Sequence, residues 1–136
     1  MEGEGRQDME LQPYRRDEAV AYARHWAYGR NPEFYDYERI GGDCTNFASQ
    51  CIYAGTGVMN YTPTFGWYYI DADNKAPAWT GVEYLHNFLI RSEISPGPIC
   101  TVTQDLAAAE PGDVIQLIFE GDVFQHSPVV VATDGS

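Results

Sequence analysis

Residues 41–55 read GGDCTNFASQCIYAG, and this stretch predicts a helix that begins beside Cys44. The two glycines supply a permissive turn, Asp43 is a good N-cap residue, and Gly55 is typical of a helix end. Apolar residues recur at three- and four-residue steps and provide one buried face: Phe47, Ala48, Cys51, Ile52 and Ala54. The sequence therefore places the Cys44 thiol in the first turn of an amphipathic helix.

This position suits a nucleophile. A cysteine attacks a carbonyl carbon as its thiolate, and the free N–H groups at the start of a helix stabilise that anion. The same N–H groups can later hold the oxyanion of a tetrahedral intermediate. The Asp43 carboxylate disfavours a neighbouring thiolate, but as an N-cap it would direct its charge at backbone donors. Cys51 is expected in the core and Cys100 follows a Pro-Gly-Pro turn, so neither has an activator.

His126 is the expected base for Cys44. It stands in the second of two β-rich runs, residues 114–119 and 123–132, which residues 120–122 join as a hairpin turn. An imidazole there can take the thiol proton and return it to a leaving amine. His25 and His86 fall on predicted helices and have no activating neighbours.

Two further helices are predicted. The first spans residues 17–28, with an apolar stripe at three- and four-residue steps. The other spans residues 80–91, where Thr80 and Glu83 have capping-box spacing. Between the helices, residues 57–79 are aromatic and irregular, as in many functional loops.

Structural explanations exist for each of these residues. A cysteine on an amphipathic helix is more often a core residue than a nucleophile, and an aromatic loop is more often packed than open to a ligand. The three cysteines and His126 contain no C-x-x-C pair, so we expect no zinc site. Cys44 and Cys51 would lie about 10 Å apart on one helix, too far for a disulfide, which needs less than about 7 Å.

The composition restricts the possible partners. The chain has 136 residues, enough for one domain, and a formal charge of −12, which disfavours nucleic-acid binding. No apolar run is long enough to span a membrane. The first residues lack the apolar region of a signal peptide, so we expect a cytoplasmic protein, or an extracellular one if this chain is a fragment.

Taken together, the sequence resembles the putative amidase domain family, within the papain-like superfamily of cysteine- and histidine-dependent amidohydrolases and peptidases. The resemblance covers residues 14–133. It is carried by six stretches, which are residues 16–23 (RDEAVAYA), 41–51 (GGDCTNFASQC), 63–67 (PTFGW), 78–80 (AWT), 111–116 (PGDVIQ) and 126–131 (HSPVVV).

The resemblance implies an α+β domain of papain-like type over residues 14–136, after a flexible acidic tail at 1–13. N-terminal helices, one of them carrying the nucleophile, would pack on an antiparallel sheet that carries the histidine. The family pattern continues beyond Ser136, so we expect a domain truncated at its C-terminus. Its sheet would be incomplete, and its third catalytic residue would lie beyond Ser136.

The resemblance also implies a reaction and its residues. Cys44 and His126 would hydrolyse an amide bond through a thioester, without metal or organic cofactor, with bacterial cell-wall peptides as a possible substrate. One of Tyr35 and Tyr37 would complete the oxyanion hole, with Asp43 as a supporting residue beside the nucleophile, and Trp67 and Trp79 would line the cleft. Two other functions remain open: a non-catalytic module that binds peptide or cell wall, and an acyltransferase with an amine acceptor.

Overall fold

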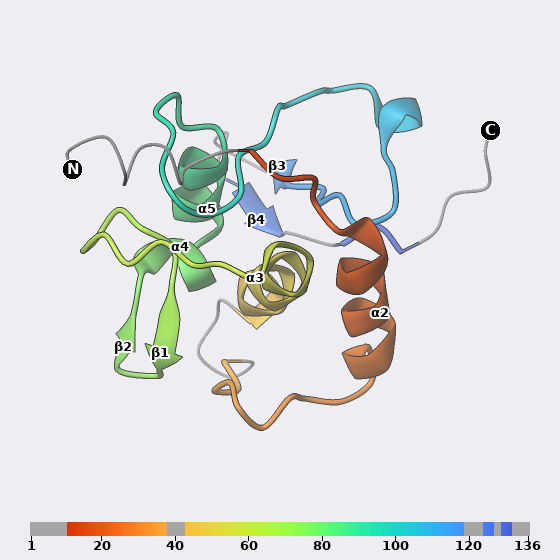
Figure 1. Cartoon of the computed structure of the whole chain (residues 1–136). Coiled ribbons are helices and arrows are strands. Elements are labelled where there is room, and N and C mark those ends of the chain that lie inside the picture. The colour runs from red at the N-terminus through yellow and green to blue at the C-terminus, as the bar shows by residue number, and fades with distance from the viewer. Residues whose placement is uncertain (1–10, 38–42, 119–123, 127–128, 132–136) are drawn as a thin grey trace.

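The computed structural model describes residues 11–37, 43–118, 124–126 and 129–131 of the chain (Figure 1). The predicted acidic tail therefore lies almost entirely outside the described residues. The described elements follow in the order α2 (Arg16–Trp26), α3 (Asp43–Thr56), β1 (Tyr69–Asp71), β2 (Asn74–Lys75), α4 (Pro77–Thr80), α5 (Val82–Leu89), the 3-10 turn η1 (Leu106–Ala108), β3 (Leu117–Ile118) and β4 (Phe124–His126).

Helix α3 is the central element of the molecule. Figure 1 looks along its axis, with α2 on one side and β1, β2, α4 and α5 on the other. Helices α2 and α3 pack on each other, and α4 packs on both α3 and α5. Because neighbours surround it, α3 buries polar as well as apolar residues, among them Thr45, Asn46, Ser49 and Gln50. The sequence predicted its position but only one buried face.

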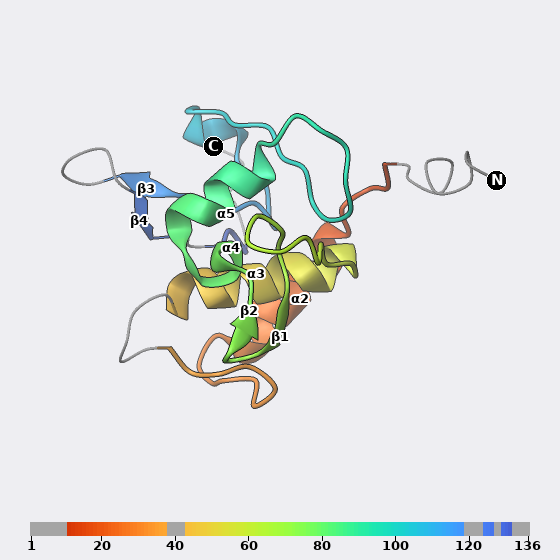
Figure 2. The same cartoon turned by 90° about the vertical axis from the view of Figure 1, so that its left-hand side faces the viewer.

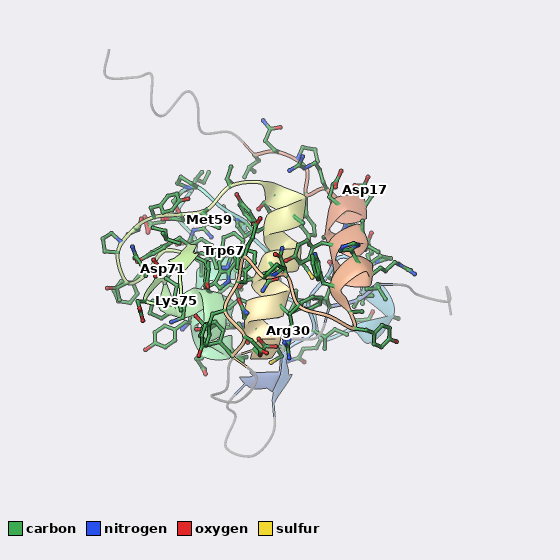
Figure 3. The ribbon with its side chains drawn as sticks, turned by 90° about the horizontal axis from the view of Figure 1, so that it is seen from below. Asp17, Arg30, Met59, Trp67, Asp71 and Lys75 are labelled. Carbon is green, nitrogen blue, oxygen red and sulfur yellow. The ribbon has the colours of Figure 1, made fainter. Side chains whose placement is uncertain are left out.

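The core lies between α3, the β1–β2 hairpin and α5. Its centre is the pair Trp67 and Trp79, whose ring centroids lie 4.8 Å apart. Figure 3 shows Trp67 on the side of α3 that faces the hairpin. The buried members of this cluster are Tyr37, Ile52, Trp67, Tyr69, Ala78, Trp79, Leu85, Phe88 and Leu89.

The helix predicted over residues 80–91 is the shorter α5, and Thr80 instead ends the separate helix α4. Gly81 has an extended backbone (φ −102°, ψ 122°), which ends α4 and precedes α5. No side chain caps the start of α5, so the predicted capping box of Thr80 and Glu83 is wrong. At the end of α4, Gly81 N–H donates a hydrogen bond to Pro77 O at 2.8 Å. This backbone hydrogen bond caps α4 without a side chain.

The region 57–79, predicted as irregular, contains the antiparallel hairpin β1–β2. Its turn is organised by Asp71, whose Oδ1 accepts a hydrogen bond from Asp73 N–H at 2.8 Å. Three- and two-residue strands are too short to show a period-two pattern. The turn residues were the signal that the sequence offered.

The described parts of the C-terminal strands are shorter than predicted. Leu117 pairs with His126 and Ile118 with Phe124 in antiparallel register, and an isolated bridge joins Val114 to Val129. The predicted turn at residues 120–122 lies outside the described residues. Helices combined with two small antiparallel sheets are compatible with the predicted α+β class.

Candidate active site

Cys44 is the second residue of α3, as the sequence predicted. The residue is exposed, and none of the three cysteines forms a disulfide. Its Sγ lies 3.9 Å from Thr45 Oγ1, and Thr45 itself is fully buried. The Cys44 thiol is thus accessible to a reagent, whereas the neighbouring Thr45 is packed in the core.

Asp43 differs from its predicted role. It is the first residue of α3 and not a cap before it, and its Oδ2 accepts a hydrogen bond from Arg30 Nη1 in an ion pair. Its Oδ1 accepts a hydrogen bond from Tyr37 N–H at 3.1 Å. The carboxylate charge is therefore directed mainly at a guanidinium. Figure 3 shows Arg30 beside the beginning of α3.

Arg30 was not identified from the sequence. Its Nε also lies 3.1 Å from Asp36 Oδ2, so one guanidinium pairs with two carboxylates. An arginine in a polar connection between helices resembles any surface arginine in sequence. Only the fold brings it to Asp43.

Tyr35 and Tyr37 lie close to the start of α3, because their backbones are bonded to it. Asn46 Nδ2 donates to Tyr35 O at 3.1 Å, and Tyr37 N–H donates to Asp43 as above. The Tyr35 side chain is half exposed, whereas Tyr37 is buried. The Tyr37 hydroxyl has no hydrogen-bond partner among the described residues, and burial raises the pKa of this phenol to about 12. Of the two, Tyr35 is the one whose ring reaches solvent.

His126 is the last residue of β4, in the predicted strand. Its side chain lies outside the described part of the structure. Its backbone is paired with Leu117, and β4 packs on α5. Figures 2 and 3 both show the β3–β4 ribbon at the same end of the molecule as the beginning of α3.

Trp67 and Trp79, predicted to line the cleft, have no exposed surface. Trp67 Nε1 donates to Ser49 Oγ at 3.1 Å, and Trp79 Nε1 donates to Asn46 Oδ1 at 2.9 Å. Both tryptophans are thus core residues whose indole N–H groups are hydrogen-bonded to α3, and in this structure they do not face an open cleft. The sequence signal for this was the pair of polar residues Asn46 and Ser49, three positions apart in α3.

The other cysteine of α3 has the environment of a structural residue. Cys51 is fully buried, and burial raises the pKa of its thiol to about 12. A thiol with so high a pKa is neutral at physiological pH and is a poor nucleophile.

A small pocket lies beside the first two turns of α3. It is lined by Gly29, Arg30, Asn31, Phe34, Tyr35, Asp43, Asn46, Phe47 and Gln50. Within the described residues, no group of three or more His, Cys, Asp or Glu side chains is arranged to hold a metal ion. None of the helices in that same part of the chain has the length and apolar composition needed to cross a bilayer.

Comparison with known proteins adds the family. The putative amidase domain matches residues 13–136 of this chain. The uncharacterized protein YhbB of Bacillus subtilis (strain 168) is 35% identical over 124 residues, which are 89% of this chain and 38% of that protein. The chain therefore spans less than half the length of this relative. No solved structure matches.

Proposed function

Because this chain belongs to the putative amidase domain family, we propose that it hydrolyses amide bonds with Cys44 as nucleophile and His126 as general base. We also propose a papain-like arrangement, in which the helix of the nucleophile faces the sheet of the histidine. The observation that carries the proposal is the exposed Cys44 thiol in the first turn of α3, at the end of the molecule where β4 lies.

The reaction would proceed in two steps. The Cys44 thiol gives its proton to His126, and the sulfur attacks the carbonyl carbon of the substrate. The C–N bond breaks as His126 protonates the leaving amine, which leaves a thioester on Cys44. Water then attacks the thioester while His126 accepts its proton, and the acid departs as Cys44 regains its proton.

The start of α3 would stabilise the oxyanion of each tetrahedral intermediate. Cys44 N–H is a helix-start donor, and Tyr35 is a second candidate because its ring is exposed near this end of α3. The Arg30–Asp43 ion pair supports the same chemistry, since it offsets the one carboxylate that adjoins the nucleophile.

The substrate would be a peptide, with cell-wall peptides as the first class to test. A mixture of cell-wall stem peptides, incubated with the purified chain and analysed by mass, should yield new amine and acid termini. Cys44→Ala should abolish this product, and His126→Ala should lower the rate by about 10²- to 10⁴-fold. Cys100→Ala, which removes another exposed thiol, is the matched control and should retain the wild-type rate.

Reactivity of the thiol gives a test that needs no substrate. Iodoacetamide near pH 6, followed by peptide mapping, should modify Cys44 before Cys51 and Cys100. Equal rates at the three cysteines would contradict an activated Cys44. Peptide binding without turnover would instead favour the non-catalytic binding module.

A further inference from the structure

The β3–β4 ribbon carries His126, and hydrogen bonds fasten the chain beside it to the helices at two places. The first of these fastenings is made by α2 and the residues just before it. Arg16 Nη1 donates to Pro111 O at 2.9 Å and pairs with Asp113 Oδ1 at 2.7 Å. Tyr14 OH donates to Gly112 O at 2.8 Å. The hydrogen bond to Asp113 raises the pKa of the Arg16 guanidinium above its ordinary value. Three consecutive residues of the turn are thus held by two side chains from the start of the described chain.

This turn pairs directly with the chain that follows β4. Gly112 N–H donates to Val130 O at 2.7 Å, and Val130 N–H donates to Asp113 O at 2.9 Å. Gly112 has φ +93°, a backbone conformation that favours glycine, and a Cβ there would crowd the Tyr14 ring at 3.3 Å. Arg24 Nη2 adds a bond to Val131 O at 3.0 Å. Helix α2 therefore holds Val131 directly, and it holds Val130 through the turn at residues 111–113.

The second fastening is on α5. Gln116 Oε1 lies 3.0 Å from His86 Nδ1, and Gln116 Nε2 donates to Val82 O at 3.2 Å. Gln116 immediately precedes Leu117, which is the register partner of His126. Both ends of the Gln116 amide are thus bonded to α5, directly beside the residue that pairs with His126.

We infer that Arg16 and Gln116 are positioning residues for the Cys44–His126 pair, an inference that rests on the proposed function. Arg16 acts through the turn at residues 111–113 and Gln116 through β3. The first fastening holds the chain beside the ribbon on α2, the second holds the ribbon on α5, and α2 packs on α3, which carries Cys44. A two-strand ribbon of this length does not hold its position alone. Its side-chain fastenings therefore set the sulfur-to-imidazole geometry, and a displacement of about 1 Å can cost about 10²-fold in rate.

The test is the pH profile of Cys44 alkylation by iodoacetamide between pH 5 and 9, mapped by peptide mass. A thiol paired with an imidazole reacts in the acid range, whereas an isolated thiol reacts only as the pH approaches its own pKa. We expect Arg16→Gln and Gln116→Leu to lower the rate at pH 6 by about 10-fold or more and to leave the rate at pH 9 nearly unchanged. Arg16→Lys, which keeps the charge opposite Asp113, should recover part of the loss.

Two matched controls separate position from general damage. Arg15→Gln removes the same charge one residue earlier, where the side chain bonds to Gly55 O and not to the ribbon. Gln104→Ala removes an exposed glutamine from the same long segment as Gln116. Both should keep the wild-type profile, and tryptophan fluorescence should report the buried Trp67 and Trp79 unchanged in every variant compared. If Arg16→Gln does not fold, the milder Arg16→Lys carries the test and should show a smaller loss at pH 6.

The outcomes distinguish the inference from the function beneath it. If His126→Ala loses the acid range while the Arg16 and Gln116 variants keep it, the positioning role is wrong and the dyad stands. If His126→Ala itself keeps the wild-type profile, both are overturned.

Discussion

Arg30 is the residue that changes the interpretation of the nucleophile. In the sequence, Asp43 adjoins Cys44 and would oppose thiolate formation unless its charge were directed at backbone donors. In the structure that charge pairs with Arg30, thirteen residues earlier, which in turn pairs with Asp36. The Asp43 carboxylate, which would oppose the Cys44 thiolate, is therefore one half of an ion pair.

Removal of Arg30 should therefore slow the alkylation of the Cys44 thiol. We expect Arg30→Gln to reduce the alkylation rate of Cys44 at pH 7 by about 3- to 10-fold, because the Asp43 carboxylate then opposes the thiolate without compensation. The change should shrink in 1 M salt, which screens exposed charges. An alkylation rate unchanged by Arg30→Gln in low salt would refute this explanation.

At the scale of elements, α3 differs most from its sequence pattern. A helix with one apolar stripe would present Asn46 and Ser49 to solvent, yet both are buried and bonded to indole N–H groups. Ser49 Oγ also donates to Trp79 O at 2.9 Å. These two residues satisfy the polar atoms that the large aromatic rings carry into the core.

Asn46→Ala should be costly for this reason. The variant leaves the Trp79 indole N–H buried without its acceptor, for which we expect a loss of about 1–3 kcal/mol in the free energy of unfolding. Urea titration followed by fluorescence measures it. The control is Asn87→Ala, an exposed asparagine on α5, where we expect a change within about 0.5 kcal/mol. Equal effects of the two substitutions would contradict the role assigned to Asn46.

At the scale of the whole molecule, the core buries groups that ionise in alkali. Burial raises the pKa of Tyr37 from 10.0 to about 12 and that of Cys51 from 9.0 to about 12. Both acids stay protonated in the folded chain at pH values where the unfolded chain has lost their protons. Stability is thus fully present below about pH 9 and falls as the pH rises toward 12.

Tyr37→Phe tests this account. At pH 7 we expect no loss of stability, because the hydroxyl has no hydrogen-bond partner among the described residues. From pH 10 to pH 11, the free energy of unfolding should fall in both proteins. The fall should be smaller in the variant than in the wild type, by up to about 1.4 kcal/mol. Urea midpoints at pH 7, 10 and 11 provide the comparison. Parallel curves for the two proteins would show that Tyr37 does not contribute.

The sequence by itself determined what depends on neighbours along the chain. The two long helices and the position of Cys44 in the first turn of one of them follow from periodicity, glycines and turn residues within a few positions. The strand that carries His126 was predicted in the same way, although its described part is shorter. Such signals act between residues that are close in sequence, so they can be recognised without knowledge of the fold.

Only the tertiary structure decided what depends on distant residues. It buried Trp67 and Trp79 instead of exposing them, paired Asp43 with Arg30, and bonded Arg16 to Asp113, 97 positions away. Burial and charge pairing are set by whichever segments pack together in space, and no local pattern encodes that choice. The position of the proposed nucleophile at the start of a helix could thus be predicted from local sequence, but the ion pair of its neighbour Asp43 and the bonds that support the β3–β4 ribbon could not.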